Sequence, residues 1–301
     1  MPCRFAILSD MHVHVDGRAS PAFEAMVARV AEARPDFVVL GGDLTSGNAA
    51  DDHPPELVAS WLDGLGAALS PLRSAEIPVL PIAGNHDYYT PAHQRAYLDA
   101  WSDLANQSGA LILRGEPPLY YSLDVDGLHL SLLHVIDQKI EPSIADWLRD
   151  DLAAAASAQL RLVVGHVPLS SAVGHTSERF LHALGGVLAS GDVAAYFCGH
   201  EHVAWDQDVD VGDGRKVRQV IVGTAGASYT FPLRRDLFDE YCDGAVGKLP
   251  RTGCVFEIDP VTRKQQEKSV LVMVQVDGAG YEVQFLALDA AGKLASFTAP
   301  T

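Results

Sequence analysis

Polar residues of the kinds that bind metal ions follow five apolar segments of this sequence. The clearest case is Gly84-Asn85-His86-Asp87, which places an amide, an imidazole and a carboxylate after the apolar run Ile77–Ile82. Four other apolar runs end in the same way, at Asp10 and His12, at Asp43, at His166, and at His200 and His202. Because open α/β folds bind their ligands at the carboxyl ends of the strands, we expect these side chains to share one site.

The expected ligands are two carboxylates, four imidazoles and one amide oxygen, from Asp10, Asp43, His12, His166, His200, His202 and Asn85. This mixture suits Mn, Fe, Zn, Co or Ni, and it is too rich in nitrogen for a dedicated Mg or Ca site. One ion needs fewer ligands than this, whereas two ions that share a carboxylate would use all of them. The sequence therefore predicts two divalent or trivalent metal ions per chain, with Mn, Fe or Zn preferred over Co or Ni.

Two of the blocks repeat a spacing of two residues, in Asp10-x-His12 and His200-x-His202. In a β-strand, residues two apart point to the same face. We therefore expect each pair to bind one ion from a single strand end.

The segments that would position these residues predict strands alternating with helices. Buried strands are expected at 4–8, 37–40, 77–82, 160–164 and 193–198, and helices at 21–34, 56–69, 91–105, 143–156 and 177–188. This alternation indicates parallel βαβ units. Between the third and fourth of these strands, short strands at 111–113, 120–125 and 128–135 indicate hairpins, with a turn at Asp126-Gly127.

After His202 the sequence predicts antiparallel strands rather than further βαβ units. Strands are expected within 203–227 and at 254–258, 269–275 and 281–288, and the less regular stretch 231–250 resembles a flap. No internal repeat or linker interrupts the chain. We expect residues 1–301 to form a single domain, with 203–301 contributing C-terminal strands and a substrate-cap segment.

The composition is that of an ordinary globular protein, with 48% hydrophobic and 20% charged residues in 301. The formal charge of -17 argues against binding to nucleic acid or to an anionic membrane, since both require clustered Lys and Arg. The four cysteines are widely spread and form no CxxC pair, which favours reduced thiols. No signal peptide is evident, and no apolar stretch approaches the roughly 20 residues of a helix that spans a membrane. We therefore expect a cytoplasmic protein.

Taken in order, the five blocks resemble the motifs of the calcineurin-like metallophosphoesterase family. The resemblance covers Asp10 to His202, about two-thirds of the chain, and the spacing is most similar to that of bacterial cyclic-nucleotide phosphodiesterases. It implies an α/β fold, a four-layer α/β/β/α sandwich with two mixed β-sheets packed face to face. It also implies a binuclear metal centre at the carboxyl ends of the strands.

The resemblance also assigns roles to individual residues. One ion would be held by Asp10, His12 and His202, the other by Asn85, His166 and His200, and Asp43 would bridge them. A hydroxide activated by two ions about 4 Å apart would attack phosphorus in line. His86 would protonate the leaving oxygen or stabilise charge on it. For Asp87, two roles are open, since it could hold the turn through backbone amides or orient a histidine.

The nature of the phosphoester is indicated less directly. No Lys or Arg lies within the five blocks, which favours a small-molecule phosphodiester over a more highly charged monoester. Arg18 and the pair Arg234-Arg235 are the basic candidates for binding phosphate, and His14 and His175 are further candidates for contacting substrate.

Other functions remain open from the sequence. One is a phosphomonoesterase acting on a nucleotide, a sugar phosphate or a phosphoprotein. Another is a mononuclear metallohydrolase of amides or esters, and a nuclease is disfavoured by the charge. A further alternative is a non-catalytic metal-binding or regulatory protein. The sequence does not indicate the oligomeric state.

Overall fold

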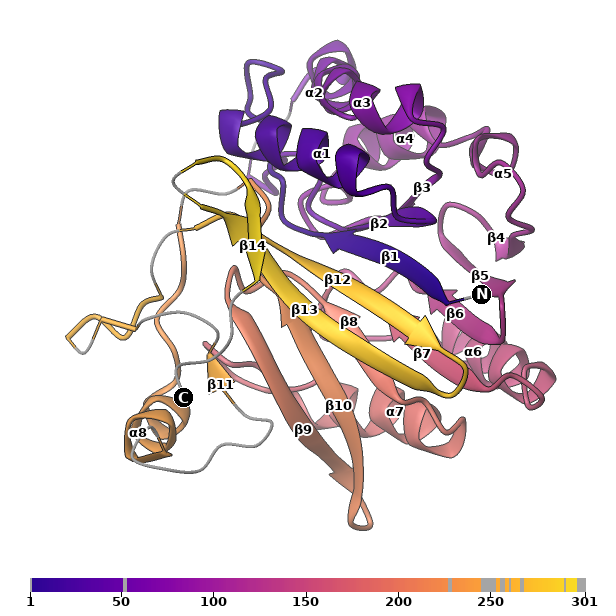
Figure 1. Cartoon of the computed structure of the whole chain (residues 1–301), viewed down its shortest axis with the longest axis vertical. Coiled ribbons are helices and arrows are strands. Elements are labelled where there is room, and N and C mark those ends of the chain that lie inside the picture. Colours follow the sequence, from indigo (N-terminus) through magenta and orange to yellow (C-terminus); the bar gives the residue numbers. More distant parts are fainter. Residues whose placement is uncertain are drawn as a thin grey trace.

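The computed structural model of the chain describes residues 2–50, 53–226, 229–244, 253–254, 258–259, 261–265, 268–289 and 291–296. In these residues two β-sheets pack face to face, and helices cover the outer face of each sheet (Figure 1). Each sheet contains both parallel and antiparallel pairs. The predicted α/β/β/α sandwich with two mixed sheets is therefore confirmed.

The first sheet joins strands from both ends of the sequence. Among the described residues its order is β14-β13-β12-β1-β2-β3. β1, β2 and β3 run parallel, and β12 pairs antiparallel with the other edge of β1. The strands are β1 (Cys3–Leu8), β2 (Phe37–Gly41), β3 (Val79–Ile82), β12 (Val270–Asp277), β13 (Gly280–Leu288) and β14 (Leu294–Ser296).

The second sheet has the order β11-β9-β10-β8-β7-β6-β5-β4 within the described part of the chain. Its four central strands, β10, β8, β7 and β6, pair in parallel. On the two sides of this centre, β9 pairs antiparallel with β10 and β5 pairs antiparallel with β6. The strands are β4 (Arg114–Glu116), β5 (Tyr120–Val125), β6 (Leu128–Leu132), β7 (Leu160–Val164), β8 (Ala195–Cys198), β9 (Ala204–Gly212), β10 (Arg215–Val222) and β11 (Gly253–Cys254). Segments after His202 thus contribute strands to both sheets.

The helices form the two outer layers. α1 to α4 lie over the first sheet, and α6 and α7 flank the second (Figure 1). No helix among the described residues combines the length and the apolar character needed to cross a membrane. The helices are α1 (Pro21–Ala33), α2 (Pro55–Ala68), α3 (Ser70–Ser74), α4 (Pro91–Ala100), α5 (Leu104–Gln107), α6 (Pro142–Ala154), α7 (Glu178–Ser190) and α8 (Arg235–Gly244).

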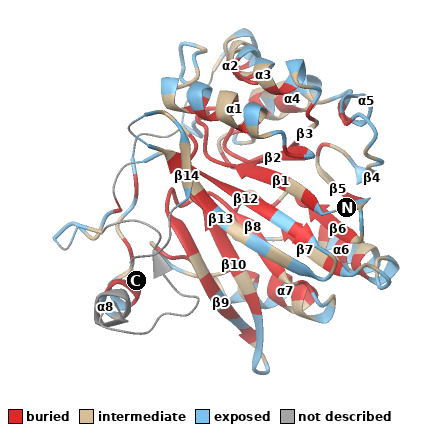
Figure 2. Cartoon of the chain, viewed as in Figure 1, coloured by how far each residue is buried: buried red, intermediate tan, exposed pale blue. Residues whose placement is uncertain are grey.

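The central strands are apolar at consecutive positions because both of their faces are buried (Figure 2). In β1, Phe5 and Ile7 pack in the core that includes the second sheet. Ala6 and Leu8 face the other way and pack in the core beneath the helices of the first sheet, with Phe23 of α1. Alternate residues of a strand point to opposite faces, so a strand between two layers needs apolar residues on both.

Some predicted elements differ from those observed. Residues 111–113 do not form a strand. Leu111 and Leu113 pack against the core from an irregular segment, and β4 begins directly after them. The predicted helix 91–105 is divided into α4 and α5. The stretch 231–250 contains α8, and its residues 245–250 lie outside the described residues, as do 255–257 of the predicted strand 254–258.

A buried polar cluster ties β5, β6 and α6 together. His129 of β6 places Nδ1 2.7 Å from Asp124 and Nε2 2.9 Å from Asp151. The hydroxyls of Ser122 and Ser131 also donate to Asp151. Burial lowers the pKa of His129, but the two carboxylates outweigh burial and raise it. Burial raises the pKa of Asp151, but the imidazole and the serine hydroxyls outweigh burial and lower it.

Asp151→Ala is expected to destabilise the protein most in mildly acidic solution. The raised pKa of His129 gives stability that is complete below its ordinary 6.5 and is lost as pH rises through the raised value. The lowered pKa of Asp151 gives stability above its ordinary 3.8 that is lost as pH falls. At about pH 5.5 the variant should therefore lose roughly 3 kcal/mol, the cost of removing one partner of a buried ion pair. Asp124 remains beside the imidazole and keeps the loss from being larger.

Chemical unfolding of both proteins without added metal, at about pH 5.5 and about pH 9, measures this difference. Asp146→Ala is the matched control, because Asp146 lies on the same helix with a side chain 71% exposed. Its effect should stay within about 0.5 kcal/mol. An equal loss for Asp151→Ala at both pH values would show that pairing of charge is not the source of the stability.

Candidate metal centre

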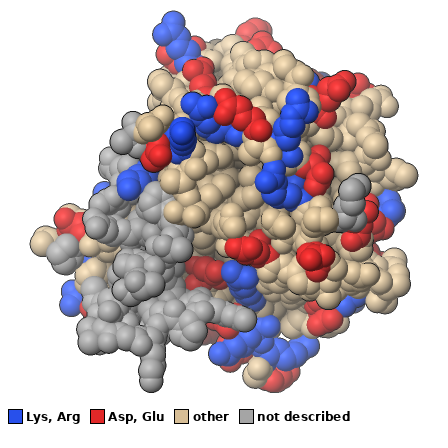
Figure 3. All heavy atoms as spheres, in the orientation of Figure 1, with Lys and Arg blue, Asp and Glu red and all other residues tan. Residues whose placement is uncertain are grey.

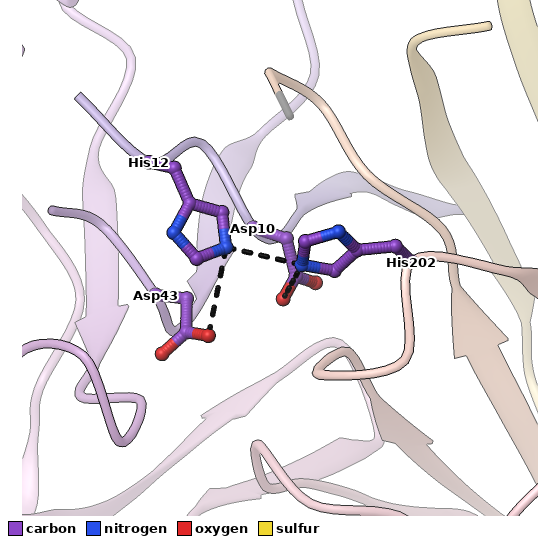
Figure 4. Close-up of side chains that lie close together, drawn as sticks. All are labelled: Asp10, His12, Asp43 and His202. Atoms are coloured by element: carbon purple, nitrogen blue, oxygen red, sulfur yellow. Dashed lines mark hydrogen bonds and ion pairs between the residues drawn. The ribbon is translucent and has the colours of Figure 1, made fainter. Parts of the chain in front are cut away.

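Four of the predicted ligands lie together at the carboxyl end of β1 and its neighbours. Their ligand atoms all lie within 4.8 Å of one another, and they belong to Asp10, His12, Asp43 and His202 (Figure 4). The Nε2 atoms of His12 and His202 are 3.0 Å apart. Nε2 of His202 is 3.4 Å from Oδ1 of Asp10, and Nε2 of His12 is 3.7 Å from Oδ2 of Asp43. These buried donors all face one small volume, which is the arrangement that a cation requires.

A second group lies beside the first and shares Asp43 with it. Ligand atoms of Asp43, His166 and His200 also lie within 4.8 Å of one another. Nε2 of His166 is 3.2 Å from Oδ1 of Asp43. Asn85 joins this group, because its Oδ1 is 2.8 Å from Nδ1 of His200. The structure thus brings together all seven residues predicted as metal ligands, with Asp43 common to both groups. His200 and His202 fall in different groups, so the expectation that this pair binds one ion is wrong.

The convergence has a different cause from the strand alternation that the sequence suggested. β1 ends at Leu8 and β8 at Cys198, before the ligands begin. Five of the seven ligand residues adopt left-handed backbone conformations, with φ of 57° at Asp10, 45° at His12, 52° at Asp43, 72° at His200 and 53° at His202. Such values are uncommon outside glycine and mark a backbone held by its surroundings. The backbone of these loops, rather than an extended strand, therefore aims the ligands.

Hydrogen bonds between loops hold this backbone in place. The amide of Asp10 donates to Gly42 O and the amide of His12 to Asp43 O, both at 3.0 Å. The amide of His200 donates to both carboxylate oxygens of Asp10, at 3.0 and 3.1 Å. The three loops that carry the first group, after β1, β2 and β8, are therefore fixed to one another.

His166 provides the test of whether these residues fit a metal ion. Its side chain is fully buried, its Nδ1 is 2.8 Å from Gly41 O, and its Nε2 makes no hydrogen bond. A buried polar nitrogen without a partner is costly. With Nδ1–H donating to the carbonyl, Nε2 keeps a free lone pair aimed at Asp43, as in a typical metal-bound histidine. The donor set therefore fits a cation.

The charges of the site depend on burial and on the two carboxylates. Burial lowers the pKa of His12 and of His200 to about 4, so both are neutral, as ligands must be. Burial also acts to lower the pKa of His166, but Asp43 outweighs it and raises this pKa to about 9. The proton that this raised pKa places on the ring beside Asp43 is the one that a bound cation would displace. Burial raises the pKa of Asp43, but His166 and the other histidines outweigh it and hold this pKa far below its usual range.

Gly199→Ala is expected to weaken metal binding while leaving the fold intact. A Cβ at residue 199 would overlap Ser9 Oγ and the carboxylate of Asp10, so Asp10 would have to move. Disturbing the support of a ligand typically lowers metal affinity about 10–100-fold. Competition with a chromophoric chelator measures this affinity. Gly186→Ala is the control, because nothing lies within 4 Å of a Cβ at that position. Similar affinities for the two variants would contradict this packing argument.

His86 lies beside both groups and is more open than the ligands. Its Nδ1 is 2.5 Å from Gly47 O, and its Nε2 is 3.9 Å from Oδ2 of Asp43. Its ring stands edge-on to His12, with centroids 4.7 Å apart. The side chain is 30% exposed. His86 is thus oriented by a backbone carbonyl and presents Nε2 to the shared carboxylate and to solvent.

Asp87 contacts backbone amides rather than the histidines. Its carboxylate accepts from the amides of Gly84, Leu44 and Thr45 at 2.9 to 3.0 Å, and from the Thr45 hydroxyl. Burial, together with the charge of Asp43, raises the pKa of Asp87 to about 6 despite these bonds. The Asp87 carboxylate therefore connects the loop after β2 to the loop after β3. This geometry favours the role of holding the turn over the role of orienting a histidine.

A cavity of about 310 Å³ opens over the two groups. Asp43, Asn85, His86, His200 and His202 lie in its wall, together with His175 from the loop before α7. Among the described residues, its lining contains no Lys or Arg. A small phosphoester could therefore reach both groups at once.

The other predicted substrate-binding residues are not in this wall. His14 and Arg18 are exposed and close a turn through the bond from His14 N to Arg18 O. Because the chain turns there, His14 does not continue an alternation from Asp10 and His12. Arg234 donates to Asp236 and to Ser171 O, and Arg235 donates to Asp239. Neither arginine lines the cavity.

The structure adds residues that the sequence did not single out. Tyr89, Tyr229 and Phe231 line the cavity, and Glu201 accepts the amide of Ala172. Tyr89 and Glu201 lie within or next to the motif blocks, so their positions could have identified them. Tyr229 and Phe231 follow β10 in a segment without a recognisable pattern, and only the fold brings them to the site.

A model of the calcineurin-like phosphoesterase family matches residues 3–204. A search of curated proteins gave no match. Among solved structures, the chain is similar to GAP50, the anchor in the inner membrane complex of Plasmodium, with 14% identity and a TM-score of 0.62 over 100% of this chain and 90% of that one. It also matches TT1561 of Thermus thermophilus, with 12% identity and a TM-score of 0.43 over 75% of this chain and 91% of that one. Vps29 of Entamoeba histolytica matches with 11% identity and a TM-score of 0.41, over 98% and 99%.

The likeness to GAP50 is at low identity and bears on the fold alone. The family model extends from the first described strand to the first residue of β9, so it includes all seven residues of the two ligand groups. It covers more than half of the chain. The chain belongs to the calcineurin-like phosphoesterase family.

Proposed function

We propose that this protein is a hydrolase that cleaves small-molecule phosphodiesters with the help of two metal ions. The observation that carries the proposal is the position of Asp43. Its carboxylate belongs to two groups of potential ligands at once, each with ligand atoms within 4.8 Å of one another. A carboxylate shared in this way is the means by which two cations are held close enough to act on one phosphoryl group. Membership of the family supports metal-dependent hydrolysis.

In this proposal each ion has its own ligands and Asp43 bridges the two. One ion would be held by Asp10, His12 and His202, and the other by Asn85, His166 and His200. Bound there, the two ions would activate water and neutralise charge on the phosphoryl oxygens. The imidazole-rich donor set favours Mn, Fe or Zn, with Co or Ni as further options.

His86 is proposed to act on the leaving oxygen. Because Gly47 O accepts from Nδ1–H, the Nε2 atom is the one that faces the reacting group. A protonated Nε2 could give its proton to the departing alkoxide or stabilise its charge. Asp87 supports this step indirectly, since its bonds to Leu44 and Thr45 position the loop that leads to Gly47.

A diester is favoured over a monoester because the cavity lacks a basic side chain. A dianionic monoester gains from an arginine or lysine beyond the metals. The lining contains no Lys or Arg among the described residues, and the guanidinium of Arg234 is engaged by Asp236 and a backbone carbonyl. A cyclic-nucleotide-like diester, which carries a single charge, suits this lining better than a phosphomonoester does.

A non-catalytic metal-binding or regulatory role is the alternative of another class. The similarity to GAP50, which is described as an anchor, supports this alternative. His86 argues for catalysis, because it belongs to neither group of potential ligands yet is held at the edge of the site by Gly47.

Nucleic acid is not the proposed substrate. The chain carries a formal charge of -17. On the face seen in Figure 3, Lys and Arg are interspersed with Asp and Glu among the described residues and form no continuous basic stripe. Binding to a polyanion requires such a stripe.

The proposal is tested by reconstituting the purified protein with Mn, Fe or Zn and counting bound ions by mass spectrometry. Turnover of bis(p-nitrophenyl) phosphate and p-nitrophenyl phosphate is then compared on the same sample. Two ions per chain and a preference for the diester are expected. Bound metal without turnover of either ester would favour the regulatory alternative, and one ion per chain would favour a mononuclear hydrolase. A preference for the monoester would favour a phosphomonoesterase.

A further inference from the structure

We infer that the cavity over the metal centre binds a planar aromatic group of the ester, through the rings of Tyr229, Phe231 and Tyr89. This inference rests on the proposed function, because it names the class of phosphodiester that the same site would accept. The three residues are called the aromatic rim below.

The rings of the aromatic rim lie against the metal-site histidines. The ring of Tyr229 is 4.5 Å from that of His202, and Phe231 is 5.5 Å from both rings. Tyr89 lies edge-on to His86 at 5.2 Å. The rim therefore borders both the proposed ligands and the proposed catalytic histidine.

These rings are exposed although apolar side chains of their size are normally buried. Tyr89 is 41%, Tyr229 44% and Phe231 40% exposed. Among the described residues, six large hydrophobic side chains are exposed, and three of them line this one cavity. Scattered exposed apolar residues need no explanation, but a cluster at a concave site usually marks a binding surface.

Three polar side chains of the cavity outside the metal centre, those of Gln138, Ser171 and Glu201, are already engaged within the protein. The amide of Gln138 donates to His175 O and accepts from the amide of Ser177. The hydroxyl of Ser171 accepts from the amides of Val173 and Gly174. What the wall offers a substrate beyond the metal centre is therefore mainly ring surface. Ring surface selects flat aromatic groups, because stacking gains energy from a π face and needs no specific hydrogen bond.

A purely structural role for the rim is less consistent with the contacts. If the Tyr229 ring served to hold His202, that histidine would depend on it for orientation. Nδ1 of His202 is instead 3.2 Å from the backbone carbonyl of Tyr229, which any residue at that position would supply. Tyr89 differs in this respect, because its hydroxyl accepts from the side-chain amide of the proposed ligand Asn85, but its ring takes no part in that bond and remains available.

The test compares two diesters with the same leaving group, phenyl p-nitrophenyl phosphate and methyl p-nitrophenyl phosphate. Each kcat/KM is divided by the rate of hydroxide-catalysed hydrolysis of the same ester, which removes the difference in intrinsic reactivity. The wild-type ratio of phenyl to methyl is expected to be about 10 or more, the effect of one stacked ring. The double variant Tyr229→Leu, Phe231→Leu should reduce this ratio to within about threefold of one.

Two further variants separate the ring from other effects. Tyr229→Phe keeps the ring and should keep the ratio, whereas Tyr229→Leu should lower it. Ile112→Ala removes a side chain that is 74% exposed and absent from the cavity, and it should leave the ratio unchanged. Circular dichroism and metal content establish that each variant is folded and loaded.

A second readout does not depend on turnover. Calorimetry of the metal-loaded protein compares phenylphosphonate with methylphosphonate, and we expect the phenyl compound to bind about tenfold more tightly. If neither ester is cleaved but this preference is found, the proposed hydrolysis fails and the aromatic site stands. Equal cleavage of the two esters with equal phosphonate binding would overturn the aromatic site alone. An equal loss on both esters in the leucine variants would assign the rings a structural role and likewise overturn it.

Discussion

Asp43→Asn is expected to bind neither metal ion tightly and to lose at least about 10³-fold in phosphodiester turnover. The side chain is buried and lies in both ligand groups, so removing its charge weakens both ions together. Each ion contributes several kcal/mol of charge stabilisation in the transition state, and 1.36 kcal/mol corresponds to a tenfold change in rate. Metal counting by mass spectrometry and turnover of bis(p-nitrophenyl) phosphate measure the two effects.

Asparagine is chosen so that a loss of metal does not simply reflect a disrupted loop. Oδ1 of Asp43 accepts the amide of His86, and an asparagine oxygen can still do so. Asp99→Asn, an exposed position on α4, is the matched control and should retain both ions and full activity. If Asp43→Asn kept one tightly bound ion, Asp43 would be an ordinary ligand of the other ion and not a bridge.

His86→Ala is expected to keep both metal ions and to lose roughly 10²–10⁴-fold in turnover, as is usual for a positioned acid. His86 belongs to neither group of potential ligands, and its ring is held by Gly47. Exposed His182 on α7 provides the control, His182→Ala. Loss of metal in the His86 variant would show that His86 is needed to bind the ions, contrary to its assignment outside the ligand set.

A series of leaving groups distinguishes the two roles left open for His86. If it donates a proton, the loss in His86→Ala should grow as the leaving alcohol becomes less acidic and should be smallest for p-nitrophenol. If it only stabilises charge, the loss should depend far less on the leaving group. The slope of log kcat against leaving-group pKa, in wild type and variant, gives the answer.

The parts of the fold that the sequence predicted are those with a strong local pattern. β2 and β7 are apolar at consecutive positions because both of their faces are buried, and this pattern located them almost to the residue. The side chain of Ser20 accepts the amide of Phe23, as is typical of a serine that precedes a helix, so the start of α1 also has a local signal. The segment 111–113 was wrongly predicted as a strand, because Leu111 and Leu113 reach the core without pairing.

The ligand positions were predicted for a partly mistaken reason. The residue types past each strand identified the site, whereas strand alternation does not explain how Asp10 and His12 converge. Their left-handed backbone depends on bonds to Gly42 and Asp43, from a distant loop, so it cannot be read from their own sequence. The same limit applies to Tyr229 and Phe231, which reach the cavity through the topology of the second sheet.

The position of β1 between β2 and β12 has a consequence for biosynthesis. β1 leaves the ribosome long before β12, because more than 260 residues separate the two strands, yet they pair along one edge of β1. The loop that carries Asp10 also depends on late residues, since Ala225 donates to Ser9 O and Thr224 to Asp10 O. Long-range closure of this kind is slow relative to local folding. A nascent chain therefore cannot complete the loop that carries Asp10 until the residues that follow β10 have been translated.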